Sequence, residues 1–293
     1  MSVLASASTT RPPAPFGLLS LIAVAIGCGV AHASEVPTGV WVRNPISWAI
    51  GAFVAVLIAR LAGPRTMSGF LVAAPLGLLA TLSSAGQLGV HRWLDIGPLH
   101  INAAQVLLPP AIAACAAPGA GRVWPWPAAA AIALLVAQPD ASQATALGGA
   151  LLVLVAASCL SRAVRAGGML LIALAVAASW LRLDPLAPVP EVEGIMTIAW
   201  AISPPLAIAA WAALLAAVGS VMLVKRLNAN AGPRALCAYA ALSAVTPLFG
   251  AFPVPLVGMA MSPILGLWLG AGVLAAQARP TSVSTYTPAA SAG

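Results

Sequence analysis

Charged side chains are scarce in this 293-residue chain, because only 6% of its residues are Asp, Glu, Lys or Arg, whereas 61% are hydrophobic. A soluble globular protein carries about 25% charged residues, so this composition excludes an ordinary soluble domain. Apolar runs long enough to cross a bilayer recur along the whole chain. Because a backbone in lipid must satisfy its hydrogen bonds internally, the sequence predicts an all-α polytopic membrane protein.

Cysteine is also rare, and the positions of the four cysteines exclude two kinds of small scaffold. They lie within or at the ends of apolar runs and never in a C-x-x-C spacing, so neither a disulfide framework nor a zinc site is indicated. The G-x-x-x-x-G-K, H-E-x-x-H and G-x-S-x-G motifs are missing, which leaves nucleotide-binding, zinc-protease and serine-hydrolase functions without support. The net charge of +7 comes from scattered basic residues, so no nucleic-acid partner is predicted.

The apolar runs divide the chain into about ten predicted spans between two polar tails. We predict that residues 1–13 and 279–293 are disordered tails, which leaves a single transmembrane domain over residues 14–278. The fifth span is short, which predicts a tilted or re-entrant helix, and Ser203-Pro204-Pro205 predicts a kink in the eighth. The predicted spans cover residues 14–33, 45–63, 67–87, 102–117, 127–138, 143–161, 166–181, 195–224, 235–250 and 254–278.

The distribution of charge predicts how these spans are oriented. Ten of the 13 basic residues fall on one side of the predicted membrane, and the other side receives only Arg43, Arg92 and Arg182, together with all six acidic residues. Because Lys and Arg accumulate in cytoplasmic loops, both termini are predicted to be cytoplasmic. The first span has an alternative, since Ala31-His32-Ala33 after an apolar run also fits the cleavage site of a signal peptide. We favour a retained first helix.

Polar residues gather in a few segments on the predicted outer side. The densest is residues 91–105, which contains two of the three histidines, an arginine and an aspartate between two apolar runs. Residues 138–145 and 182–193 form two more polar clusters, and a Pro-rich stretch at 252–262 re-enters the predicted membrane. These segments are the candidate site.

Their motifs resemble, in order, those of the FtsW, RodA and SpoVE family, the SEDS peptidoglycan polymerases. The family's R-R-W-I-D-L-G is matched by H-R-W-L-D-I-G at 91–97, and its Q-P-D-L-G-T-A by Q-P-D-A-S-Q-A at 138–144. Its G-L-P-L-P-F-I-S-Y-G-G-S is echoed at 251–262, and its L-P-E-x-H-T-D by Val189-Pro190-Glu191. The resemblance covers nearly the whole chain and implies a SEDS-like helical bundle in the bacterial cytoplasmic membrane.

The departures from the family pattern concern its charged residues. The aspartate proposed as the family's catalytic base falls at Ile195 in an ungapped match, so the base is absent or displaced to Glu193 or Glu191. A glutamate and a lysine that the family carries after the first motif are replaced by Gln105 and Leu108. Losing both members of a buried ion pair leaves no stranded charge, so this double change describes a site rebuilt with less charge.

The resemblance supplies candidate roles, and most of the residues also have a structural alternative. Arg92 either holds a lipid-linked pyrophosphate or pairs with Asp95. Trp93 contacts substrate or anchors the loop at the membrane interface, and Asp140 contacts a ligand or caps the sixth span. Ser262 serves substrate or helix packing. The candidate catalytic residues are thus Glu193 and Glu191, and the candidate substrate-binding residues are Arg92, Trp93, Asp95, Gln105, Asp140 and Ser262.

The resemblance implies a glycosyltransferase that polymerises lipid II, with a divalent cation (Mg²⁺ or Mn²⁺) if it is catalytic, beside a single-span penicillin-binding transpeptidase. The missing aspartate leaves catalysis open. One alternative is a non-catalytic scaffold for a cell-wall synthase partner. Another is a small-solute or lipid transporter, which the Pro-broken helices would suit.

Overall fold

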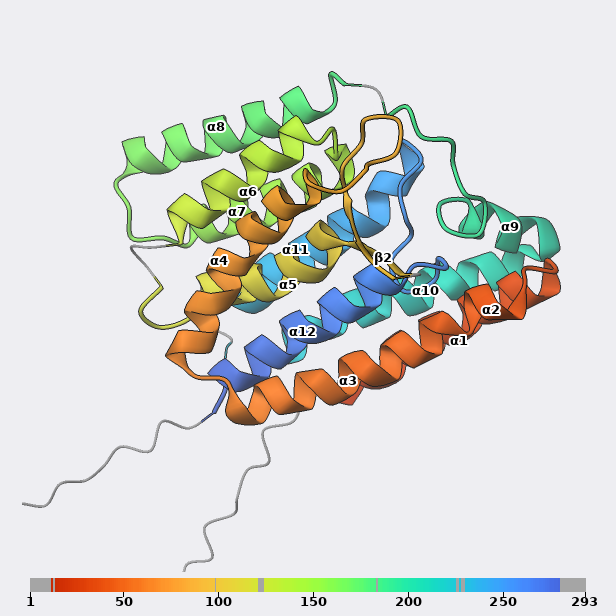
Figure 1. The fold of residues 1–293 in the computed structure, drawn as a ribbon. Helices are drawn as coiled ribbons and strands as arrows, with labels where there is room; N and C mark the ends of the chain where they lie inside the picture. Colours follow the sequence, from red (N-terminus) through yellow and green to blue (C-terminus); the bar gives the residue numbers. More distant parts are fainter. Residues whose placement is uncertain are drawn as a thin grey trace, which may run out of the picture.

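The computed structural model describes residues 12, 14–97, 99–120, 124–182, 184–224, 227 and 230–279. It is a helical bundle with one small β-hairpin on its flank (Figure 1). The predicted disorder of residues 1–13 and 279–293 falls outside the described residues, apart from residues 12 and 279. The α helices are α1 (Ala14–Ala33), α2 (Thr38–Trp41), α3 (Arg43–Leu61), α4 (Pro64–Thr81), α5 (Ala103–Cys115), α6 (Pro125–Ala137), α7 (Ala141–Ala156), α8 (Arg162–Ser179), α9 (Ile195–Ile202), α10 (Pro204–Ser220), α11 (Ala231–Val245) and α12 (Met261–Gln277). Short 3-10 turns at Val221–Leu223 and Thr246–Leu248 follow α10 and α11.

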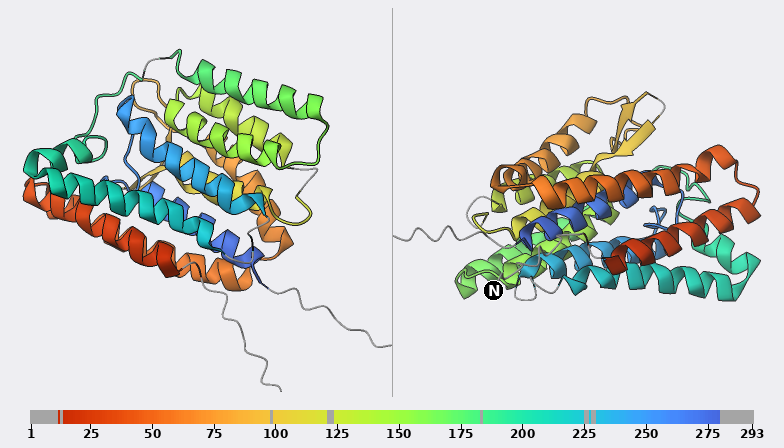
Figure 2. Two further views of the ribbon diagram at one scale, coloured as in Figure 1. Left: turned by 180° about the vertical axis from the view of Figure 1, so that it is seen from behind. Right: turned by 90° about the horizontal axis from the view of Figure 1, so that it is seen from below.

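The all-α prediction is confirmed, and the long helices lie side by side with their axes roughly aligned (Figures 1 and 2). Four stretches are long and apolar enough to cross a membrane by length and composition: α1, residues Thr38–Leu61, α8 and Pro204–Leu223. Helices α5, α6, α7 and α12 are apolar but shorter. The number of membrane crossings and the side on which the termini lie therefore stay predictions.

The predicted break in the eighth span is confirmed, because the span is divided into α9 and α10. Ser203 between them is fully extended, with φ −166° and ψ 120°. Pro204 and Pro205 occupy the first turn of α10, where a helix needs no N–H donor. The fifth span is also short as predicted, since α6 ends at Ala137.

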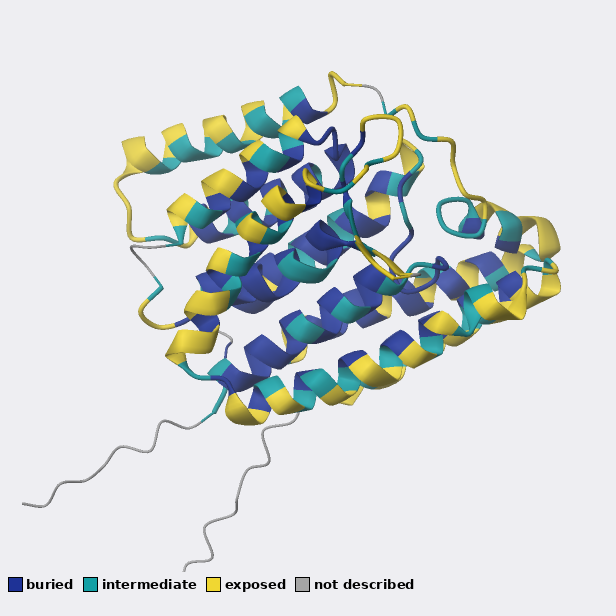
Figure 3. Ribbon diagram, in the orientation of Figure 1, coloured by how far each residue is buried: buried dark blue, intermediate teal, exposed yellow. Residues whose placement is uncertain are grey.

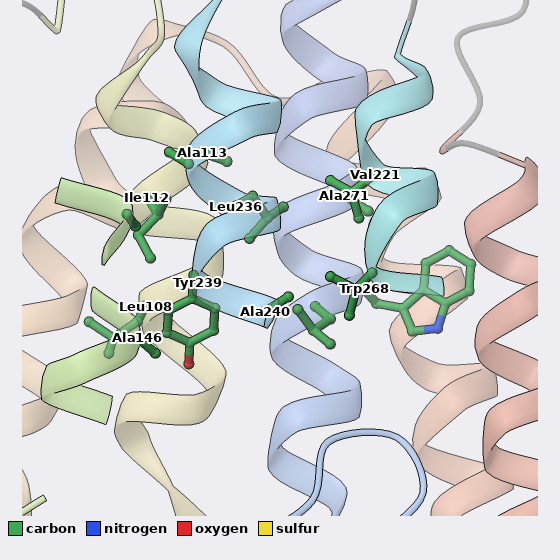
Figure 4. Close-up of a cluster of buried hydrophobic side chains, with 14 of the residues drawn as sticks. Leu108, Ile112, Ala113, Ala146, Val221, Leu236, Tyr239, Ala240, Trp268 and Ala271 are labelled. Carbon is green, nitrogen blue, oxygen red and sulfur yellow. The ribbon is translucent and has the colours of Figure 1, made fainter. Parts of the chain in front are cut away.

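Helix α12 is the centre of the bundle, and α8 is the most exposed of the four helical stretches long enough to cross a membrane (Figure 3). Most residues of α12 are buried, whereas α8 buries only Ser179. Gly266 allows α12 to approach α5 closely, since a Cβ there would lie 1.9 Å from the Gln105 carbonyl oxygen. On the opposite side of α12, Trp268, which is labelled in Figure 4, packs edge-on against Phe16 and Trp48 at centroid distances of 5.0 and 5.4 Å.

The polar segment 91–105 forms a hairpin that the sequence did not predict. Strands β1 (Trp93–Ile96) and β2 (Leu99–Asn102) pair antiparallel, with Trp93 opposite Asn102. Gly97 has φ 59°, the left-handed conformation that tight turns require. Asn102 ends β2 and starts α5, because its Oδ1 accepts the Gln105 N–H at 3.0 Å.

Candidate functional site

A polar cleft lies where the hairpin, the start of α7, the segment before α9 and the stretch before α12 meet. It consists of two adjoining cavities of about 280 and 400 Å³, which share wall residues that include Trp93, Gln105 and Glu193. We name them the Arg92 cavity and the Arg43 cavity, after the arginine that lines each. Together they form one cleft with Glu193 on the shared wall.

The structure brings most of the predicted site residues to this cleft. Arg92 and Asp140 line the Arg92 cavity, and Glu191 and Ser262 line the Arg43 cavity. Asp95 lines neither cavity. It lies on the exposed side of the hairpin, where its Oδ1 is 2.6 Å from His100 Nδ1.

Arg92 does not pair with Asp95, so that predicted pairing is wrong. Its Nη1 donates to Asp184 Oδ2 at 2.7 Å, its Nε lies 3.6 Å from Asp140 Oδ2, and its Nη2 donates to the Pro139 carbonyl oxygen. The side chains of Arg92 and Asp140 are only 6% and 4% exposed, and that of Asp184 is 16% exposed. Arg92 therefore joins the hairpin, the α6–α7 turn and the segment before α9 through buried charge.

Asp140 has the capping role that the sequence offered as an alternative. Its Oδ1 accepts the Gln143 N–H at 3.1 Å at the start of α7. The Gln143 side chain then accepts a hydrogen bond from the Tyr239 hydroxyl on α11. The polar contacts that begin at Arg92 thus continue into the middle of the bundle.

Ser262 and Gln105 also line the cleft. The Ser262 hydroxyl accepts the Asn102 N–H at 3.0 Å, which ties the end of the hairpin to the start of α12. Gln105 lines both cavities and is only 5% exposed. Leu108 one turn later is 1% exposed in the core, which fits the prediction of a site rebuilt without the ion pair.

Glu193 is the carboxylate on the wall that the two cavities share. Its Oε2 accepts the Val189 N–H, and the residue is half-buried. Burial raises the pKa of the Glu193 carboxyl, the hydrogen bond from Val189 opposes that shift, and the charges of Asp184 and Glu191 add to it. Glu193 is therefore protonated more easily than a free glutamate.

Glu191 and Ile195, two residues before and two residues after Glu193, have different surroundings from it. The Glu191 carbonyl oxygen accepts the Met259 N–H at 2.9 Å, and the Val192 carbonyl accepts the Val254 N–H at 3.1 Å, so this segment is fastened to the stretch before α12. Ile195, at the position of the family's aspartate in the ungapped match, is fully buried in the core.

Several polar residues of the cleft were missed by the sequence interpretation as site residues, and Arg43, Asp184 and Gln143 are among them. Arg43 lines the larger cavity, and it forms no ion pair within the described chain. The charge distribution contained a signal for it, because Arg43 is one of the few basic residues on the predicted outer side. Asp184 and Gln143 contact partners 92 and 96 residues away, which no local pattern indicates.

The cleft does not supply a complete cation site from its own side chains. Among the described residues, no three His, Cys, Asp or Glu side chains lie close enough together to hold a metal ion. Glu191 and Glu193 both line the Arg43 cavity, but one oxygen of Glu193 is already bonded to Val189. The divalent cation stays an expectation of the resemblance.

Comparison with known proteins gives a result for structure only. No protein-family model and no curated protein sequence matches the chain. Crystal structures of the rod shape determining protein RodA from Thermus thermophilus match at 18% identity, with TM-scores of 0.63 for a point mutant and 0.61 for the unmutated protein. In both, 88% of this chain and 94% of the RodA chain are covered. A chain from a structure of a peptidoglycan synthase complex that coordinates polymerization and crosslinking matches with a TM-score of 0.60 at 19% identity, over 89% of this chain and 96% of that one.

The chain has the RodA fold. This agrees with the family that the sequence motifs indicated, and the low identity agrees with a divergent sequence. Together with the apolar helices, the RodA fold makes the chain a helical membrane protein.

Proposed function

We propose that the chain is a peptidoglycan-synthesis protein of the bacterial cytoplasmic membrane and that its cleft binds lipid II. The observation that carries this proposal is the cleft itself, where an arginine lines each cavity and Glu193 lies between them. The RodA fold supports it, since that neighbour is named as a rod shape determining protein and another belongs to a peptidoglycan synthase complex.

The reaction that best suits this arrangement is glycosyl transfer between two lipid-linked sugars. Glu193 removes the proton from the acceptor sugar hydroxyl. The hydroxyl oxygen then forms a bond to the anomeric carbon of the donor, the bond from that carbon to the diphosphate breaks, and polyprenyl diphosphate leaves. Arg43 is the cation available to the leaving group, because its guanidinium has no ion pair within the described chain.

Lipid II polymerisation by the purified protein tests this function. The decisive variant is Glu193→Gln, which keeps an oxygen to accept the Val189 N–H but cannot accept a proton from substrate. We expect polymer from the wild type and a loss of about a hundredfold or more in rate for the variant, the range for removing a general base. Asp95→Asn, outside the cleft, is the matched control. No polymer from the wild type, under conditions where a related polymerase is active, would exclude the enzyme.

A non-catalytic scaffold is the second candidate, and it has its own supporting observation. Ile195 is fully buried where the family's motif places an aspartate. The exposed apolar surface of α8 offers lipid or a single-span helix, such as that of a penicillin-binding transpeptidase, a long face to contact.

Co-purification with a transpeptidase from the host membrane discriminates the two candidates. A scaffold retains its partner and supports growth when Glu193→Gln replaces the wild type. An enzyme does not support growth with this variant, even where the partner is still bound. A protein that binds no transpeptidase and makes no polymer would fit neither candidate.

A further inference from the structure

One ion pair holds the segment of residues 184–190 over the cleft. Before this segment, Arg182 Nη1 donates to the Ala137 carbonyl oxygen at 2.7 Å, and after it Val192 is bonded to Val254. Between these points, the Arg92–Asp184 pair is the only hydrogen bond or ion pair in the described chain that joins residues 184–190 to anything outside 184–194. The other polar contacts of the segment, at Leu186 and Val189, are internal.

The two carboxylates that face Arg92 are held differently. Asp140 is 4% exposed and is fixed by the N–H of Gln143 at the start of α7. Asp184 is 16% exposed and belongs to an irregular segment whose neighbouring residues are mostly exposed. Asp184 is therefore the partner of Arg92 that can leave without unfolding a helix end.

Arg92 and Asp184 both line the Arg92 cavity, so a ligand in that cavity meets their ion pair. A phosphate oxygen matches a guanidinium as well as a carboxylate oxygen does, including in bidentate geometry. Exchange of one anionic partner for another leaves the buried Arg92 paired throughout. The large cost of an uncompensated buried charge is thereby avoided.

We propose that the Arg92–Asp184 ion pair is a clasp: the diphosphate of a lipid-linked ligand replaces the Asp184 carboxylate on Arg92, and residues 184–190 open. This inference rests on the proposed function, because it requires a lipid diphosphate in the cleft. Asp184 is then a positioning residue that occupies the place of the ligand's phosphate in the empty protein.

The clasp links ligand binding to Glu193. Leu186, Ala187 and Val189 line the Arg92 cavity, and the Val189 N–H is bonded to the Glu193 carboxylate. Opening of the segment therefore moves the residue that holds Glu193 in its present position. The carboxylate becomes free to turn into the cleft once a diphosphate is bound.

Hydrogen–deuterium exchange of residues 184–190 tests the clasp in the full-length protein in nanodiscs. The probes are a polyprenyl diphosphate, the matching polyprenol and inorganic diphosphate, with affinity measured in parallel. The decisive variant is Asp184→Asn, which removes the charge but keeps an oxygen for the Leu186 N–H. Asp184→Ser serves if the Asn variant is unstable. Asp140→Asn is the matched control, since it faces the same arginine and keeps the cap of α7.

In the wild type, the polyprenyl diphosphate accelerates exchange in 184–190 and the polyprenol does not. Asp184→Asn exchanges fast without ligand and binds the diphosphate about fivefold more tightly, the gain from removing one competing, partly exposed carboxylate. Asp140→Asn without ligand exchanges in 184–190 at the wild-type rate. The same acceleration by inorganic diphosphate would identify free phosphate as a sufficient ligand and would still support the clasp.

Two results overturn the proposal, and they differ in what they mean for the proposed function. If the lipid diphosphate binds but leaves exchange in 184–190 unchanged or slower, and Asp184→Asn binds no more tightly, the clasp is wrong while the lipid-binding cleft stands. If neither the wild type nor Asp184→Asn binds any diphosphate, both the clasp and lipid II binding are wrong.

Discussion

Arg92 and Arg43 both line the cleft, but their surroundings are opposite. Arg92 is 6% exposed and faces two aspartates and a carbonyl oxygen. Arg43 is exposed at the first residue of α3 and has no ion pair within the described chain. The arginine that matches the family's motif is thus held by protein partners that a ligand must replace, whereas the arginine outside those motifs is free to meet a ligand.

Replacing each arginine by leucine gives the largest expected difference. Arg92→Leu leaves Asp140 and Asp184 as uncompensated charges in a buried site, which costs about 3–5 kcal/mol. Arg43→Leu removes an exposed, unpaired side chain and changes stability by about 0.5 kcal/mol or less. Thermal unfolding in one detergent measures both. Equal shifts for the two variants would remove the distinction between the arginines.

Replacing Asp140 and Asp184 as well tests whether the stability lost in Arg92→Leu comes from stranded charge. Asp140→Asn and Asp184→Asn added to Arg92→Leu take away the stranded charges and keep the cap of α7, so part of the lost stability returns. No recovery would mean that Arg92 stabilises the fold through packing of its long side chain and not through its charge.

Arg43 is expected to contribute to ligand binding although it contributes little to stability. Arg43→Gln removes the cation offered to a diphosphate in the larger cavity, so affinity for a polyprenyl diphosphate falls about tenfold, as expected for one charged hydrogen bond. Protein stability stays unchanged, and Arg43→Lys restores most of the affinity. An unaltered affinity would show that Arg43 only borders the cleft.

The contrast between the arginines also shows which features of the structure could be predicted from the sequence. The helices follow from apolar length and proline, so α1 was predicted at its observed bounds and the break at Ser203 was expected. The partner of Arg92 was sought three residues away at Asp95, but its bonded partner is Asp184, 92 residues away. Charge pairing across the fold depends on tertiary packing, which residue spacing does not encode.

The hairpin escaped prediction for a related reason. Its strands are four residues long and do not alternate between buried and exposed sides, so the usual period of two is absent. The cap by Asn102 and the bond from Asn102 to Ser262 fix it, and both require α5 and α12 to be in place. The polar residues therefore located the candidate site in the sequence, but they did not predict its geometry.

The pH dependence of polymerisation tests the charge around Glu193. As the proposed base, Glu193 must be unprotonated, so activity rises as pH increases through its raised pKa. The charge of Glu191 is one cause of that raised pKa, so Glu191→Gln lowers it and moves the acidic limb of the profile to lower pH. Asp140→Asn serves as the control and leaves the limb in place. A shift to higher pH in Glu191→Gln would contradict this assignment.

The smallest effect is expected at Asp95, the motif residue that lines neither cavity. Its ion pair with His100 is solvent-exposed, with 48% and 62% of the two side chains accessible, and it exists as an ion pair only when the histidine is protonated. Exposed pairs of this kind contribute about 0.2–1 kcal/mol, so Asp95→Asn should change neither polymerisation nor diphosphate affinity measurably. Asp95 lies only three residues from Arg92 in the same motif. Comparing Asp95→Asn with Arg92→Leu therefore separates what the motif contributes to folding from what it contributes to ligand contact. A strong loss of activity in Asp95→Asn, with stability intact, would mean that a ligand or partner reaches over the hairpin and that the binding surface extends beyond the cleft.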